Sequence, residues 1–106
     1  SRPPMAWVAS RGTRAGVRGT PGASPADLGA RNIRVNAVAP GAVPTEGTAK
    51  HRNAELDARR IARTPLGRLG TVEDIADAIC FLAGDGSRFF NADVLRLDGG
   101  ASETSL

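Results

Sequence analysis

Two strand-like runs lie too far apart in this sequence to form a hairpin. The first, Ile33-Arg34-Val35-Asn36-Ala37-Val38-Ala39, places an apolar side chain at every second position and stops at Pro40-Gly41. The second, Val94-Leu95-Arg96-Leu97, is followed by Asp98-Gly99-Gly100. Strands joined by so long a connection are typical of a crossover unit, in which the two strands lie parallel. This spacing predicts a βαβ unit.

The segment between these runs carries a strong helix signal over residues 71–83. Thr71 is a good N-cap, and Asp74 lies three residues on, where its carboxylate completes a capping box. Apolar residues then recur every three or four positions, which places them on one helical face. Gly84 is expected to end the helix in a left-handed conformation.

A second, weaker helix is predicted over residues 52–63. Glu55 lies four residues before Arg59, in the orientation that favours an ion pair. The apolar stripe consists essentially of Leu56 and Ile61, so we expect this helix on the surface.

The predicted fold class is α/β, as the C-terminal βαβ part of a Rossmann-like doubly wound parallel sheet. Two parallel strands cannot form a covered sheet, so the unit implies further strands beside it. Residues 1–26 contain four prolines and four glycines but few large apolar side chains, and an irregular or disordered segment is expected there. We therefore divide the chain into an irregular segment, 1–26, which an out-of-frame reading would explain, and a folded part, 27–106.

Composition narrows the function classes. The 106 residues suit one small domain. A single cysteine, Cys80, excludes an intrachain disulfide and a cysteine-based metal site, so no metal is predicted and a cytoplasmic location is expected. No apolar run is long enough to span a membrane. The basic residues of segment 1–26 are interrupted by glycines, which favours an unstructured segment over a nucleic-acid-binding arm.

Three segments in order carry a resemblance to a known family. They are residues 33–41, residues 65–76 (Pro-Leu-Gly-Arg-Leu-Gly-Thr-Val-Glu-Asp-Ile-Ala) and residues 94–100. Together they resemble the C-terminal portion of the short-chain dehydrogenases/reductases. The resemblance implies hydride transfer between NAD or NADP and a small-molecule carbonyl or alcohol.

The same resemblance implies a set of cofactor-binding residues. Pro40 and Gly41 would let the chain pass close to the nicotinamide ring. The backbone of Val43 would bond the carboxamide, and the Thr45 hydroxyl would reach the carboxamide or the pyrophosphate. Ligands of such sheets bind at the carboxyl ends of the strands, where this loop begins.

The catalytic residues of the family are absent from these 106 residues. The family uses a tyrosine as general acid or base, assisted by a lysine four residues later. This sequence has no tyrosine, and its one lysine is Lys50. The family spacing places the tyrosine near Ser10 and the lysine near Arg14, and neither residue can do that work. No catalytic residue is therefore assigned.

We predict a truncated NAD(P)-dependent short-chain oxidoreductase, inactive as an isolated chain. Two alternatives stay open. One is a non-catalytic interaction module that forms a homo-oligomer through residues 71–100, where an exposed strand edge would allow pairing. The other is a gene remnant without a role.

Overall fold

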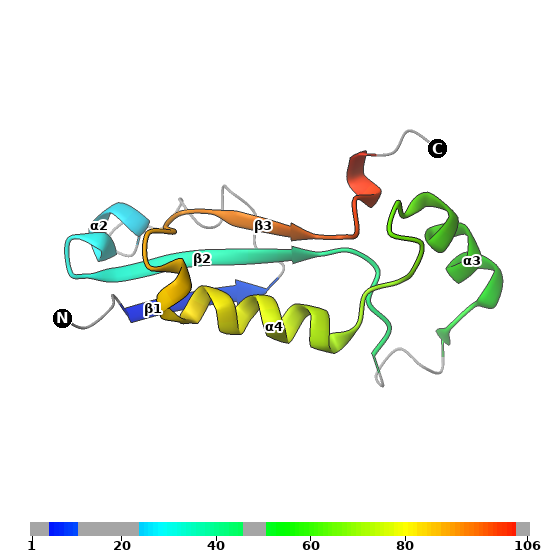
Figure 1. Cartoon of the computed structure of the whole chain (residues 1–106), viewed down its shortest axis with the longest axis horizontal. Helices are drawn as coiled ribbons and strands as arrows, with labels where there is room; N and C mark the ends of the chain where they lie inside the picture. The colour runs from blue at the N-terminus through cyan, green and yellow to red at the C-terminus, as the bar shows by residue number, and fades with distance from the viewer. Residues whose placement is uncertain (1–4, 11–23, 46–50, 104–106) are drawn as a thin grey trace.

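The computed structural model describes residues 5–10, 24–45 and 51–103, which form an α/β unit (Figure 1). The elements in chain order are β1 (Met5–Ser10), α2 (Pro25–Gly29), β2 (Ile33–Pro40), α3 (Ala54–Arg63), α4 (Val72–Ala83), the short 3-10 helix η2 (Asp85–Ser87), β3 (Val94–Leu97) and the 3-10 helix η3 (Ala101–Glu103). In this part of the chain, no helix has the length and apolarity needed to cross a bilayer.

The three strands form one parallel sheet in the order β1-β2-β3. Ala37 of β2 pairs with Val94 of β3, and the register continues to Pro40 beside Leu97. The structure therefore confirms the predicted βαβ unit. Helix α4 packs on β1 and β2 and runs along one face of the sheet, while α3 lies beyond the ends of β2 and β3 (Figure 1).

The N-terminal segment differs in part from the irregular structure expected for residues 1–26. Residues 5–10 form β1, which pairs with β2 from Met5 beside Ile33 to Ser10 beside Val38. Helix α2 begins at Pro25, with Ser24 as its N-cap. Composition misses such a strand because its backbone bonds come from a neighbouring strand, and local residue content does not report pairing across a sheet.

Helix α4 begins as its sequence predicts and ends differently. The Thr71 side chain accepts a hydrogen bond from the Asp74 amide, and the Asp74 carboxylate accepts one from the Thr71 amide, so the capping box is confirmed. Gly84 does end the helix, but with an extended backbone at φ −96°. A left-handed cap is therefore the wrong prediction there. The carbonyls of Leu82 and Gly84 at this end accept hydrogen bonds from the Arg34 side chain of β2 instead.

Helix α3 forms close to its predicted range and has no buried residue. Asn53 is the N-cap, and its side chain accepts a hydrogen bond from the Leu56 amide at 3.0 Å. The ion pair at its start joins Arg52 to Asp57 at 2.8 Å. The Asn53 cap and this ion pair stabilise the first turn, in place of the expected pair of Glu55 with Arg59.

Arg34 is a charged residue at the centre of the described packing, with 4% of its surface exposed. It lies on the face of β2 that meets the C-terminal end of α4. Nη2 donates to the carbonyl of Leu82 at 2.9 Å and to that of Gly84 at 3.3 Å. Nη1 donates to the carbonyl of Ser87 at 2.8 Å and to that of Phe90 at 3.2 Å. One guanidinium group thus joins β2 to the end of α4, to η2 and to the loop that follows.

Two asparagines align the segment before β3 with β2. Buried Asn36 donates to the Phe90 carbonyl at 3.2 Å and accepts from the Asp93 amide at 3.1 Å. Asn91 accepts from the Val35 amide at 3.0 Å. Ala92, which follows Asn91, has φ 59°. This left-handed conformation costs a residue with a Cβ about 1–2 kcal/mol. The hydrogen bonds made by the Asn91 side chain and by the Asp93 amide hold the Ala92 backbone in this conformation.

Replacing Arg34 by methionine is expected to lower the free energy of unfolding by about 3 kcal/mol, because buried carbonyls lose their donors. Urea unfolding followed by circular dichroism measures the change. Arg96→Met is the matched control, since the Arg96 side chain is 54% exposed in its ion pair with Glu103. The control should lose less than about 1 kcal/mol. Equal losses in the two variants would contradict a structural role for Arg34.

Candidate functional site

The carboxyl ends of β2 and β3 lie side by side, and the loops that leave them form the candidate site. In parallel α/β sheets ligands bind at this edge. Pro40 is the last residue of β2, and Gly41 to Thr45 follow it. The Gly41 amide donates to the Leu97 carbonyl at 3.0 Å, which continues the pairing of β2 with β3 for one residue beyond the strand.

Gly41 is required by its neighbour in the sheet. A Cβ at this position would lie 2.8 Å from the Cβ of Asp98 and 3.0 Å from its Cα, closer than real Cβ atoms approach. The family resemblance implies a glycine here because the chain would pass close to the nicotinamide ring. The structure gives a second and independent reason, which is the approach of the turn after β3.

The remaining predicted cofactor residues lie along the same loop. Pro40 and Val43 are half-buried, and Thr45 is exposed. The carbonyl of Ala42 accepts from the Gly70 amide at 3.0 Å, and a Cβ on Gly70 would lie 3.0 Å from Cγ2 of Val43. The loop is therefore fixed against the segment that leads into α4.

The turn after β3 is organised by Asp98. Its carboxylate accepts from the Gly100 amide at 2.9 Å and from the Ser102 amide at 3.0 Å, and also from the Ser102 hydroxyl. The Ser102 hydroxyl is the main cause that lowers the pKa of Asp98. Gly99 and Gly100 have φ 61° and 92°, which a residue with a Cβ rarely adopts. Asp98 therefore fixes the turn that follows β3.

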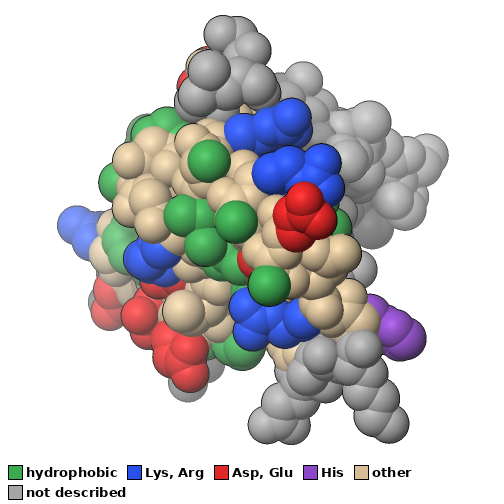
Figure 2. Space-filling view, turned by 90° about the vertical axis from the view of Figure 1, so that its right-hand side faces the viewer, with side chains coloured by type: hydrophobic (Ala, Val, Ile, Leu, Met, Phe, Trp, Pro, Cys, Tyr) green, Lys and Arg blue, Asp and Glu red, His purple; other side chains and the backbone are tan. Residues whose placement is uncertain are grey.

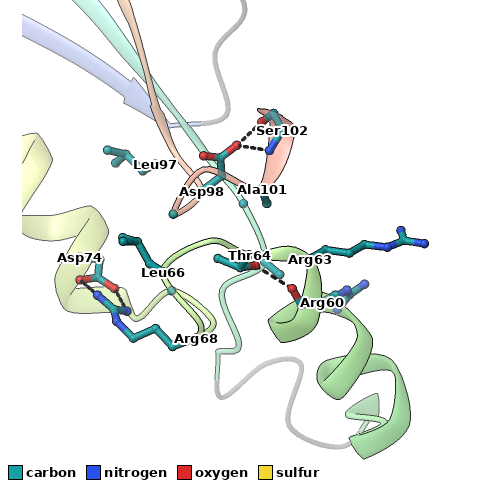
Figure 3. Close-up of a pocket in the computed structure, with 14 residues that line it drawn as sticks. Arg60, Arg63, Thr64, Leu66, Arg68, Asp74, Leu97, Asp98, Ala101 and Ser102 are labelled. Carbon is teal, nitrogen blue, oxygen red and sulfur yellow. Dashed lines mark hydrogen bonds and ion pairs between the residues drawn. The ribbon is translucent and has the colours of Figure 1, made fainter. Parts of the chain in front are cut away.

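A second carboxylate, Asp74, is bonded at the start of α4. It receives Nη1 of Arg68 at 2.7 Å and Nη2 at 3.2 Å, besides the Thr71 amide of the capping box (Figure 3). The Arg68 guanidinium is the main cause that holds the pKa of Asp74 well below its usual range. The same contact raises the pKa of Arg68.

These loops border a partly open cavity of about 560 Å³ (Figure 3). Its walls come from the loop after β2, the end of α3, the connection from α3 to α4, and the turn after β3. The lining residues are Gly41, Ala42, Arg60, Arg63, Thr64, Leu66, Arg68, Gly70, Asp74, Leu97, Asp98, Gly99, Ala101 and Ser102. Of the four predicted cofactor residues only Gly41 lines it, so Pro40, Val43 and Thr45 mark an adjoining part of the edge.

The positions that family spacing assigns to the catalytic pair are only partly described. Ser10 is the last residue of β1, beside Val38. Arg14 lies outside the described residues. The sequence alone shows that the catalytic tyrosine is absent from these 106 residues, because they contain no tyrosine at any position.

Arg60, Arg63 and Arg68 of the cavity were not singled out from the sequence. The signal available was the run of basic residues in the last turns of α3, which a helix C-terminus also favours for electrostatic reasons. Only the folded chain shows that Arg60 and Arg63 of α3 border a cavity.

Residues 7–102 match a family model described as enoyl-(acyl carrier protein) reductase. Among curated proteins, the chain is 44% identical over 87 residues to the 3-oxoacyl-(acyl-carrier-protein) reductase of Chlamydia trachomatis, covering 82% of this chain and 35% of that protein. The chain spans about a third of the length of the curated relatives that it matches.

Solved structures show the same likeness. A gluconate 5-dehydrogenase from Burkholderia cenocepacia, in complex with NADP and tartrate, has a TM-score of 0.67 at 35% identity, covering 74% of this chain and 31% of that one. A putative 2-deoxy-D-gluconate 3-dehydrogenase from Agrobacterium tumefaciens with bound NADP has a TM-score of 0.69 at 33% identity, covering 76% and 33%.

The low pKa of Asp74 predicts a loss of stability in acid. A carboxyl group whose pKa is lower in the folded chain stabilises it above the unfolded pKa, about 3.9, and that contribution is lost as the pH falls through the folded value. Asp74→Asn should therefore unfold at lower urea concentration than the wild type at pH 7, and the difference should shrink below pH 4. Asp77→Asn, on the exposed side of the same helix, is the control. A difference that does not change with pH would contradict the assignment.

Proposed function

This chain belongs to the short-chain dehydrogenase/reductase family, and we propose that it supplies the nicotinamide-facing edge of an NAD(P)-dependent oxidoreductase that interconverts carbonyl groups and alcohols. Its α/β fold is the Rossmann-like parallel arrangement predicted from the sequence. The observation that carries the proposal is the loop from Pro40 to Thr45, which leaves the carboxyl end of β2 beside a cavity.

The residues of this loop fit the nicotinamide end of the cofactor. Pro40 and Gly41 turn the chain at the sheet edge. The backbone of Val43 would bond the carboxamide, and the Thr45 hydroxyl would reach the carboxamide or the pyrophosphate. When bound, the cofactor supplies or accepts the hydride. Two similar structures are named as NADP complexes, which supports a nicotinamide cofactor. NAD or NADP remains the proposed pair, because no described residue selects between them.

The same proposal includes inactivity of the 106-residue chain by itself. Without a tyrosine there is no phenol to protonate a carbonyl oxygen, and Lys50, the one lysine, has no such group to assist. No catalytic residue is assigned. The division into segments 1–26 and 27–106 stays a proposal about sequence character, since β1 lies within the first segment and α2 crosses the boundary. A cytoplasmic location, supported by the exposed free thiol of Cys80, is also part of the proposal.

Two measurements on the purified chain test this function. Nuclear magnetic resonance (NMR) titration with NADP⁺ is expected to shift the backbone amides of Gly41, Val43 and Thr45, while Arg31, at the opposite end of β2, stays unmoved. NADPH with a ketone or an acetoacetyl thioester should show no oxidation above the blank, because the proton donor is missing. Substrate-dependent oxidation would overturn the assigned inactivity, and amide shifts confined to other regions would overturn the cofactor residues.

A second candidate function is assembly through residues 71–100. Helix α4 exposes Val72 and Phe81, and the Phe89 side chain is completely exposed. Among the described strands β3 is an outer one, so one of its edges has no neighbour in the sheet order. Exposed aromatic side chains and a strand edge without a neighbour each favour a protein contact. We propose a homo-oligomer that uses this surface.

Replacing Phe81 and Phe89 together by serine should convert such an oligomer to a monomer, because the apolar contact is lost. Size-exclusion chromatography with light scattering gives the mass of each form. Ile61→Ser, an exposed apolar residue on α3, serves as control and should leave the mass unchanged. A monomeric wild type at micromolar concentration would rule the proposal out.

A further inference from the structure

An open groove lies at the amino end of β2, at the opposite end of the sheet from the candidate site (Figure 1). Its volume of about 340 Å³ is at the small end of the range of small-molecule sites. Its walls come from the end of α2, from the start of β2 and from the loop between η2 and β3. The described lining consists of Gly29, residues 32–34 and residues 88–91.

The groove contains positive charge that is not paired with a described carboxylate. Arg34 lines it, and the Nη atoms of this buried side chain bond only carbonyl and hydroxyl oxygens. Arg88 is exposed, and its Nη1 donates to the backbone carbonyl of Asp85 at 3.0 Å. None of the described lining residues is acidic. The end of the molecule that carries the candidate site differs, because it presents both basic and acidic side chains (Figure 2).

The guanidinium of Arg34 is also short of one hydrogen bond. Its Nε is a buried nitrogen that has no partner among the described residues. A buried charge whose donors are not all bonded is costly, because it has lost its hydration. Opposite charges attract more strongly through the protein interior than through water, since the effective dielectric constant there is lower. An anion seated in the groove would therefore offset part of that cost without direct contact with Nε.

Aromatic rings stand beside this charge. The Phe89 side chain is completely exposed, and Phe90 has 37% of its surface exposed. Phe90 makes an edge-to-face contact with Phe81, with ring centroids 5.6 Å apart. A further ring can pack on phenylalanine in the same way, and such pairs contribute more than the burial of apolar area alone. The groove thus offers an aromatic surface next to a cation.

We propose that this groove binds a small aromatic carboxylate, with its ring against Phe89 and Phe90 and its carboxylate on the guanidinium of Arg88. Beside the bonded Nη1, the Nε and Nη2 of Arg88 form a fork that matches the two oxygens of a carboxylate. Charge-assisted bonds of this kind are about twice as strong as neutral ones. The buried charge of Arg34 adds attraction from the side of β2. The site lies away from the loop Gly41–Thr45, so it is independent of the proposed function.

Benzoate is the probe, and the 106-residue chain is titrated by NMR. Its dissociation constant should be on the order of 1 mM, because the groove is open and the ligand is small. The amides of Arg88, Phe89 and Phe90 should shift, whereas those of Gly41 and Val43 stay unmoved. Samples are diluted until light scattering gives a monomer, because Phe89 also belongs to the surface proposed for assembly.

Two related ligands separate the contributions of charge and ring. Benzyl alcohol keeps the ring without the charge, and cyclohexanecarboxylate keeps the charge without the aromatic ring. Each should bind at least about threefold more weakly than benzoate. Equal affinity for benzyl alcohol would overturn the carboxylate contact, and equal affinity for cyclohexanecarboxylate would overturn the aromatic one.

Three exposed positions supply the variants. Arg88→Gln should weaken benzoate binding about fivefold, since a charge-assisted hydrogen bond is lost. Phe89→Leu keeps an apolar side chain without the ring, and should weaken binding about threefold. Arg59→Gln is the matched control, because it removes the same charge from α3, outside the groove. Its affinity should stay within about twofold of the wild type, since salt screens a distant surface charge.

The absence of benzoate-dependent shifts at Arg88, Phe89 and Phe90 would overturn the proposal. An equal loss of affinity in Arg88→Gln and Arg59→Gln would also overturn it, by reducing the effect to net charge. Shifts confined to residues 60–70 would place the carboxylate in the candidate cavity instead and contradict the groove. Titration with NADP⁺ in the same samples keeps these failures distinct from that of the proposed function.

Discussion

The buried guanidinium of Arg34 is the contact on which the arrangement of this chain depends. The last carbonyls of a helix have no partner within it and carry a partial negative charge. Arg34 bonds the carbonyls of Leu82 and Gly84 at the end of α4, then those of Ser87 and Phe90 beyond it. No carboxylate is needed, because several carbonyl dipoles share the charge. The side chain thereby determines where α4 ends against the sheet and how the chain returns to β3.

The opposite end of α4 is joined to the candidate site. Its capping box includes Asp74, whose carboxylate also receives Arg68 from the preceding connection. That connection is bonded to the loop after β2 through Gly70 and Ala42, and to the turn after β3 through Leu66 and Gly99. The walls of the cavity are therefore parts of the sheet and of the helix ends. A ligand there would meet a surface that is set by backbone bonds as well as by side chains.

The candidate site combines the loop from Pro40 to Thr45, which we propose faces the cofactor, with a cavity beside it. The loop from Pro40 to Thr45 offers backbone groups and one hydroxyl, which suit the orientation of a bound nicotinamide. The cavity is lined by arginine side chains, by hydroxyl groups and by apolar side chains. Neither supplies a proton donor for the carbonyl. The role that we propose for these residues is therefore binding alone.

The sequence by itself determined the elements whose signals are local. The alternation of Ile33 to Ala39, the capping residues Thr71 and Asp74, and the Asp98-Gly99-Gly100 turn act within a few residues, so pattern and composition suffice to place them. Only the tertiary structure decided which distant groups meet. Strand β1 depends on pairing with β2, the end of α4 depends on Arg34 some fifty residues earlier, and Arg60 and Arg63 border a cavity only because α3 lies beyond the strand ends. Contacts between distant residues leave no periodic mark in a sequence, because the fold alone sets the distance between them.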